Sequence, residues 1–151
     1  MAEVTINKMM KLSEHFTLAE LCKTSAKTAD GNIPSHVHIE NLKNLCENWL
    51  EPLRQRYNKP ILINSGFRSE AVNKAIGGVK GSNHLTGCAV DIRVTGPEQA
   101  IRYACILLDI ADESKCDFDE LLIERSPKGG YWVHFAVRPK DNRRKVRFIQ
   151  T

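Results

Sequence analysis

The chain has 151 residues, of which 42% are hydrophobic and 26% are charged. This composition is ordinary for one soluble globular domain with a single hydrophobic core. The net charge is +4, and the densest basic cluster, Lys140–Arg147, is too short for a nucleic-acid-binding arm, so we expect no nucleic-acid partner. No apolar run is long enough to span a bilayer, so we also expect no membrane insertion.

The N-terminus and the cysteines bear on the compartment. Residues 1–8 contain no apolar signal region, so we expect a chain that stays cytoplasmic until it is released. The five cysteines are odd in number and form no Cys-x-x-Cys pair. We therefore expect them to be small buried hydrophobic side chains in a reducing compartment, rather than disulfides, redox centres or zinc ligands.

Residues 1–11 are predicted to form a lead-in to one domain over residues 12–151. Thr17-Leu18-Ala19-Glu20 has the pattern of a capping box and opens a short predicted helix. Apolar residues recur at three- and four-residue steps over residues 35–57, which predicts a long amphipathic helix. Pro52 lies inside this pattern and is expected to kink or split that helix.

Two more helices and five strands follow. Ser69 can cap a helix over residues 70–76, and Pro97 occupies a favoured first-turn position of another helix. The predicted strands cover residues 61–64, 88–94, 118–125, 131–138 and 144–150. A five-residue loop makes the third and fourth strands a hairpin. The expected fold is therefore α+β: a single domain with a small, mostly antiparallel sheet and helices packed on one face.

Three side chains on this sheet predict a metal site. Strand alternation directs Asp91 and His134 away from the apolar face, and His84 stands seven residues before Asp91 across a glycine turn. A single loop or strand histidine is usually a surface or structural group, but an unpaired carboxylate among apolar neighbours is costly. Two imidazoles and one carboxylate leave one zinc position open, as in catalytic sites. We therefore predict one Zn²⁺ ion on the face away from the helices.

Other polar residues are candidates for the chemistry around that ion. The expected hairpin register pairs Glu124 with Trp132 and places Glu124 diagonal to His134, at about 7 Å between Cβ atoms. Glu124 could then act as general base on a zinc-bound water, although a one-residue slip would turn it away. Arg68 is either a surface arginine or a planar fork for a carboxylate. Ser82 is either a turn residue or a donor to substrate, and Trp132 is expected to form a pocket wall.

Several motifs together resemble the zinc D-Ala-D-Ala carboxypeptidase family, and in particular its small single-domain members from bacteria and phages. The resemblance covers about residues 12 to 138. It rests on Ser65-Gly66-Phe67-Arg68-Ser69, Ser82-x-His84-x-x-Gly87-x-Ala89-x-Asp91, Trp132-Val133-His134, and the segments 12–21 and 72–78. It implies that His84, Asp91 and His134 bind zinc. It also implies that Arg68, with help from Ser82, holds the carboxylate of the substrate.

The resemblance implies a zinc metallopeptidase that hydrolyses a peptide bond in the peptidoglycan stem peptide, as a D,D-carboxypeptidase or an endopeptidase. We expect a monomer that acts at the cell wall after release through a pore, from a phage particle or by lysis. Many relatives carry the acidic base three residues before the last zinc histidine, where this chain has Tyr131; Glu124 is the substitute candidate. The alternative is a wall-binding module that keeps the zinc site but lacks a competent base. A purely structural zinc is disfavoured because three ligands are present rather than four.

Overall fold

The computed structural model describes residues 7–151, so the predicted lead-in lies largely outside the described residues. The boundary at residue 12 stays a prediction. Within residues 7–151, no helix is both long and apolar enough to cross a membrane. The helical elements are α1 (Leu18–Leu21), α2 (His36–Leu45), the π-helical turn η1 (Cys46–Leu50), α3 (Glu51–Tyr57), α4 (Glu70–Ala75), the 3₁₀ helix η2 (Asn83–Thr86) and α5 (Pro97–Ser114).

Five strands form one mixed sheet in the order β1-β2-β4-β3-β5. They are β1 (Ile63–Ser65), β2 (Ala89–Arg93), β3 (Glu120–Arg125), β4 (Tyr131–Ala136) and β5 (Lys145–Gln150). Every neighbouring pair is antiparallel except β3 and β5, which run parallel. The predicted α+β class is confirmed. The predicted hairpin register is also confirmed, because Glu124 pairs with Trp132 and Arg125 with Tyr131.

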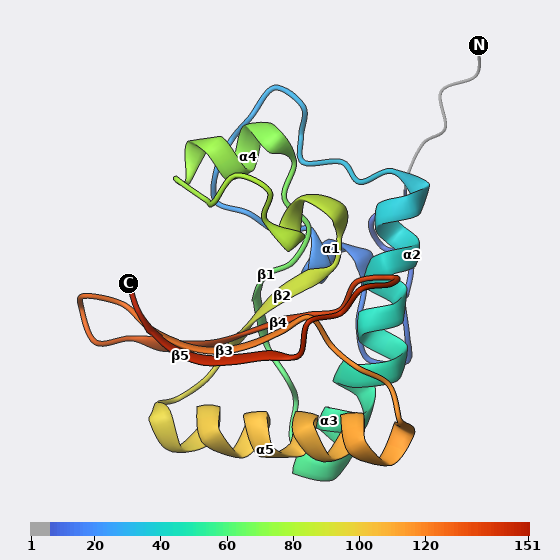
Figure 1. Ribbon diagram of the computed structural model, residues 1–151. Helices are drawn as coiled ribbons and strands as arrows, with labels where there is room; N and C mark the ends of the chain where they lie inside the picture. Colours follow the sequence, from blue (N-terminus) through green and yellow to red (C-terminus); the bar gives the residue numbers. More distant parts are fainter. Residues whose placement is uncertain (1–6) are drawn as a thin grey trace.

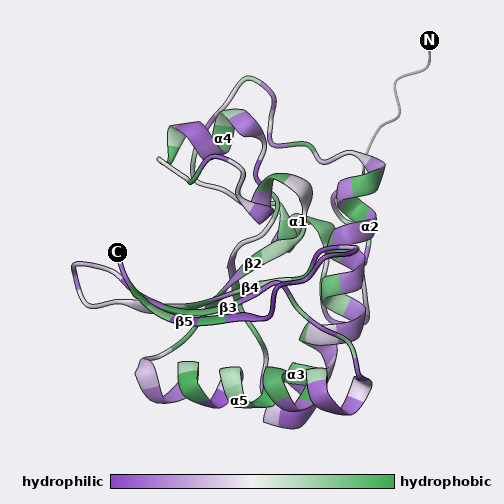
Figure 2. Ribbon diagram, viewed as in Figure 1, coloured by the Kyte–Doolittle hydropathy of each residue, from purple (hydrophilic) through white to green (hydrophobic). Residues whose placement is uncertain are grey.

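The two faces of the sheet have different coverings. Figure 1 shows α5 and α3 below the sheet, whereas α4 and the segment that contains η2 lie above it. The lower face carries Val90 and Ile92 of β2 and Val133 and Phe135 of β4, all buried in the core. Figure 2 shows that α5 presents hydrophobic residues toward the sheet and hydrophilic residues outward. The upper face carries the other half of the alternation, which includes Asp91 and His134 together with Leu122 and Trp132.

The long helical segment changes its hydrogen-bond pattern just before Pro52. Pro52 has no N–H, so it cannot donate to the carbonyl four residues before it. Just before Pro52 the helix widens into η1, in which the Glu51 N–H donates to Cys46 O. The predicted interruption at Pro52 thus takes the form of a π-helical turn between α2 and α3, a common cause of helix kinks.

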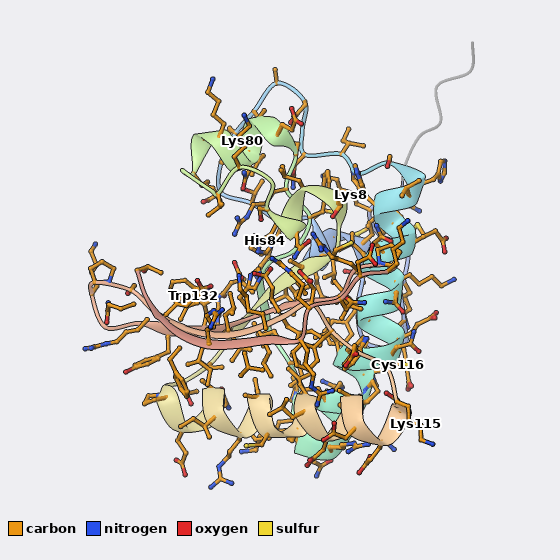
Figure 3. All side chains as sticks on the ribbon, viewed as in Figure 1. Lys8, Lys80, His84, Lys115, Cys116 and Trp132 are labelled. Atoms are coloured by element: carbon orange, nitrogen blue, oxygen red, sulfur yellow. The ribbon has the colours of Figure 1, made fainter. Side chains whose placement is uncertain are left out.

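The five cysteines are all free thiols, but only three are buried. The expectation of buried side chains is wrong for Cys105 and Cys116. Cys105 lies on the solvent side of α5, whose buried stripe is centred on Tyr103 and Leu107. Cys116 follows the end of α5 at the surface, as Figure 3 shows. The helical period places Cys105 next to the buried stripe of α5. The sheet covers the stripe itself and leaves Cys105 exposed.

Candidate metal centre

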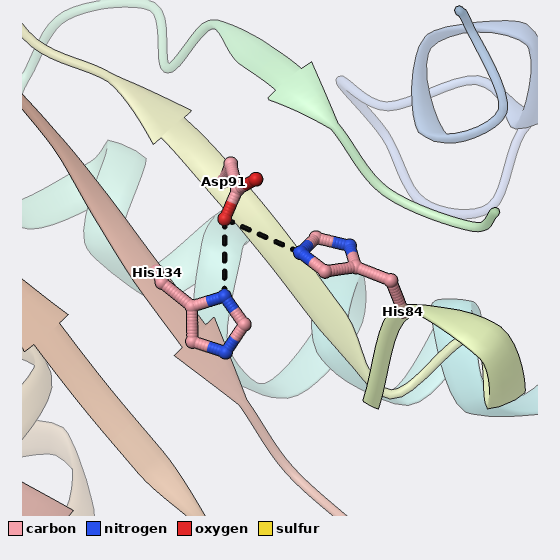
Figure 4. A group of neighbouring side chains, drawn as sticks. All are labelled: His84, Asp91 and His134. Atoms are coloured by element: carbon pink, nitrogen blue, oxygen red, sulfur yellow. Dashed lines mark hydrogen bonds and ion pairs between the residues drawn. The ribbon is translucent and has the colours of Figure 1, made fainter. Parts of the chain in front are cut away.

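Three polar side chains come together on the upper face of the sheet. Asp91 on β2 is the direct partner of His134 on β4, and His84 reaches them from η2. One ligand atom from each lies within 4.8 Å of the other two, and all three residues are buried. Figure 4 shows both imidazole rings pointing toward the same oxygen of Asp91. The structure therefore brings the three predicted ligands together, although they come from three separate segments.

The segment that carries His84 is a short 3₁₀ helix. Ser82 caps it, because the Ser82 Oγ accepts a hydrogen bond from the His84 N–H at 3.2 Å. Gly87 ends it with φ of 74°, a left-handed conformation that glycine adopts without strain. The chain then enters β2 at Ala89, so the backbone between His84 and Asp91 is held by η2 at one end and by the sheet at the other.

Hydrogen bonds determine which imidazole nitrogens face the centre. His84 Nδ1 lies 2.6 Å from Gly66 O, and His134 Nε2 lies 3.1 Å from Glu120 Oε1. Because a carbonyl and a carboxylate only accept, a neutral imidazole that keeps these contacts has its hydrogen on this nitrogen and its lone pair on the other. The other nitrogens, His84 Nε2 and His134 Nδ1, lie 3.3 and 3.0 Å from Asp91 Oδ1. Two nitrogen donors and one carboxylate oxygen thus converge, which is a donor set that fits zinc.

The charges at this centre depend strongly on one another. Burial alone would raise the pKa of Asp91, but the charge and hydrogen bonds of His84 and His134 outweigh it and hold that pKa below its usual range. Burial alone would lower the pKa of His134, whereas hydrogen bonds with Asp91 and Glu120 raise it to about 9. A cation at this place would compete with the proton of His134, since metal ligands must be deprotonated.

Glu120 and Asn83 belong to the centre and were not singled out from the sequence. Glu120 contacts His134, and Asn83 Nδ2 donates to the same Glu120 oxygen at 2.8 Å. Glu120 pairs with Ala136 and is therefore a diagonal neighbour of His134, like Glu124 on its other side. The alternation that identifies Glu124 also puts Glu120 on this face, so a signal for Glu120 existed.

Arg68 lies beside the three potential ligands. Its guanidinium binds Ser65 Oγ at 3.0 Å, Asp91 Oδ2 at 3.0 Å and, more weakly, Asn73 Oδ1 at 3.4 Å. Three of the five N–H groups of the guanidinium are engaged in these bonds, which leaves the others for a ligand. Asp91 therefore turns one oxygen to Arg68 and the other to the two imidazoles.

These residues open into a cleft of about 660 Å³. Trp132 and Glu124 form part of its wall, and Trp132 Nε1 donates to Glu124 Oε2 at 2.7 Å. Burial raises the pKa of Glu124 above its ordinary value. Figure 3 shows His84 above the sheet and Trp132 on the sheet itself, in β4. The lining residues are Arg68, Ile76, Gly77, Gly78, Val79, Gly81, Ser82, Asn83, His84, Asp91, Glu120, Leu122, Glu124, Trp132, His134, Ile149 and Thr151.

Tyr131 lies on the opposite face of the sheet. Its ring packs against the hydrophobic core, and the Arg125 guanidinium lies 5.9 Å from the ring centroid. Since residues three apart on a strand face opposite sides, position 131 does not direct its side chain into the cleft that His134 lines. Within residues 7–151, the glutamates that line this cleft are Glu120 and Glu124.

An α+β domain in which a buried His-Asp-His set lines a cleft has the arrangement of a metal-dependent hydrolase. The family model described as Peptidase M15 matches residues 14–121, and the chain belongs to that family. The matched segment contains His84 and Asp91, and His134 lies beyond it. The chain is also similar to the zinc D-Ala-D-Ala carboxypeptidase of Streptomyces albus G, at 32% identity over 96 residues. This match covers 58% of the chain and only 37% of that relative.

Proposed function

We propose that the protein is a zinc-dependent peptidase that hydrolyses a peptide bond in the peptidoglycan stem, as a D,D-carboxypeptidase or an endopeptidase. Membership of the Peptidase M15 family and the name of the Streptomyces relative support the peptidase, the zinc ion and the type of substrate. One observation carries the proposal: His84 Nε2 and His134 Nδ1 converge on Asp91 Oδ1 inside a cleft.

In this proposal His84 Nε2, Asp91 Oδ1 and His134 Nδ1 hold the zinc ion. When bound, zinc would polarise the scissile carbonyl and make a water molecule more acidic. Glu124 accepts the proton of the attacking water and returns it to the leaving amine. Its raised pKa suits this exchange, because a general base works best when its pKa is near the working pH. The hydrogen bond from Trp132 holds the Glu124 carboxylate at the wall of the cleft.

Arg68 is the proposed partner of the substrate carboxylate. Its guanidinium is fixed by Ser65 and Asp91 and still has N–H groups to donate. A fixed guanidinium next to the metal ligands would place the end of a peptide so that its last bond reaches them. Ser82 Oγ accepts from the His84 backbone, and its hydroxyl hydrogen can be donated to the substrate. Both residues line the cleft.

A second candidate function is wall binding without hydrolysis. It is favoured by the position of Tyr131, which packs on the core where many relatives carry the acid that moves the proton. Proton transfer would then depend on Glu124, whose carboxylate already accepts a hydrogen bond from Trp132. A protein of this kind would keep the zinc ion and the Arg68 pocket and hold the stem peptide uncut.

One measurement tests the zinc site that both functions require, and a second separates the two functions. Metal analysis of protein purified without added zinc should find about one equivalent per chain, and His84→Ala and Asp91→Ala should each lose it. Mass spectrometry of peptidoglycan fragments after incubation should then identify the bond that is cut. Glu124→Gln should abolish cleavage but keep the metal, while the exposed Glu98→Gln on α5 serves as the matched control. Intact fragments that co-sediment with wild-type protein would support the binding function, and metal-free, well-folded wild type would refute both.

A further inference from the structure

Glu120 contacts the ring nitrogen of His134 that does not face Asp91, and the proposed hydrolysis gives Glu120 no part. We propose that Glu120 is a positioning residue that fixes His134 as a metal ligand, and that Asn83 holds Glu120 in place. The inference rests on the proposed zinc site, because the effect of Glu120 is expressed through the binding of that ion.

His134 lies between two carboxylates. Asp91 Oδ1 is 3.0 Å from Nδ1, and Glu120 Oε1 is 3.1 Å from Nε2. A neutral imidazole carries one hydrogen, and a metal can bind only the nitrogen without it. If Asp91 were the only carboxylate, the hydrogen would favour Nδ1 and point into the metal centre. Glu120 accepts the hydrogen on Nε2 and so leaves the Nδ1 lone pair for the ion. A carboxylate behind a histidine ligand has this orienting effect in many metal sites.

Asn83 restrains Glu120 from the other side. Its Nδ2 donates to Glu120 Oε1 at 2.8 Å and to Asp119 Oδ2 at 2.8 Å, which engages both hydrogens of the amide. Asp119 is fully buried and is bound by Arg143 through Nε at 3.0 Å and Nη2 at 2.8 Å. Glu120 therefore meets His134 through an oxygen that a fixed donor already holds. Because Asn83 precedes His84 in η2, the same short helix supplies one ligand and the support of another.

Glu124 gives a natural comparison for Glu120. Both glutamates are on β3, both are diagonal neighbours of His134, and both line the cleft. Glu120 binds His134, whereas Glu124 binds Trp132. The geometry thus assigns metal positioning to Glu120 and leaves proton transfer to Glu124, and the two assignments can be tested separately.

The test measures zinc affinity by competition with a chromophoric chelator, and the visible absorption of the Co²⁺-substituted protein, in Glu120→Ala, Glu120→Gln and Glu124→Gln. Glu120→Ala should weaken zinc binding about 10- to 100-fold and change the Co²⁺ spectrum. Glu120→Gln should lie between Glu120→Ala and wild type, because its amide oxygen can still accept from Nε2. Glu124→Gln should bind zinc within about twofold of wild type. Urea unfolding midpoints of the metal-free variants check that each one folds.

A double-mutant cycle tests the contribution of Asn83. Asn83→Ala should weaken zinc binding in the wild-type background and have no further effect in Glu120→Ala. Asn41→Ala is the matched control, since Asn41 Nδ2 also supports this helix, through Thr86 O at 2.9 Å, without touching Glu120. Zinc affinity of folded Glu120→Ala within twofold of wild type, with an unchanged Co²⁺ spectrum, would overturn the inference and leave the proposed function intact. An undiminished effect of Asn83→Ala in the Glu120→Ala background would overturn the part assigned to Asn83.

Discussion

Replacing Gly87 by alanine tests whether the backbone between His84 and Asp91 is as constrained as the structure indicates. Gly87 has φ of 74°, and a Cβ added there would lie 2.5 Å from the backbone oxygen of His38 on α2. That oxygen cannot move without shifting the first turn of α2. Gly77 offers the matched comparison, because its φ is 72° and a Cβ there would meet nothing within 4 Å.

The two substitutions differ only by the steric overlap. A left-handed conformation costs an alanine about 1–2 kcal/mol, and this term applies at both positions. Forcing an extra carbon into a packed site costs about 1–3 kcal/mol more, and this term applies at Gly87 alone. We therefore expect Gly87→Ala to lower the free energy of unfolding by about 2–5 kcal/mol and Gly77→Ala by about 1–2 kcal/mol.

The assay is urea unfolding of the metal-free proteins, followed by circular dichroism at a fixed pH. The slope against urea should be unchanged, so that the shift in midpoint reports stability. Zinc affinity should fall in Gly87→Ala as well, because relief of the overlap displaces either η2 with His84 or the start of β2. Equal destabilisation at the two glycines would show that the close approach to His38 does not constrain the site, and it would refute the reasoning.

Three further predictions concern pH, metal and thiols. Burial alone would raise the pKa of Asp119, but hydrogen bonds from Arg143 and Asn83 outweigh it and lower the pKa below its usual range. The stabilisation by the Asp119 carboxylate is present above about pH 4 and is lost as the pH falls further. Asp119→Asn should therefore lower the free energy of unfolding by about 3 kcal/mol at pH 6, and by clearly less at pH 3, in urea titrations. A pH-independent loss of stability would contradict this prediction. Removing zinc should lower the free energy of unfolding by about 4 kcal/mol relative to protein in about 1,000-fold excess of zinc over its Kd. Calorimetry with and without chelator measures this loss of stability, and adding zinc back should restore it. Alkylation of the native protein should modify Cys105 and Cys116 at once and the three buried thiols only in denaturant, and rapid modification of all five would contradict the observed packing.

Local patterns in the sequence predicted much of this site. Strand alternation depends only on neighbouring residues, so it identified the shared face of Asp91 and His134 before any tertiary contact was known. The five-residue hairpin loop likewise determined the register that opposes Glu124 to Trp132. Pro52 signalled a break in its helix because the missing N–H is a property of the residue itself.

Only the tertiary structure decided how separate segments meet. Glu120 and Glu124 are equivalent by alternation, and side-chain packing directs one to His134 and the other to Trp132. β5 pairs with β3 in parallel because the edge of β3 is free in the folded sheet. Cys105 is exposed because it lies on the side of α5 that the sheet does not cover. The approach of His84 to Asp91 depends on the 2.6 Å contact between its ring and Gly66 O, a residue 18 positions away. Contacts of this kind carry no local period, because they are set by long-range packing rather than by neighbouring residues.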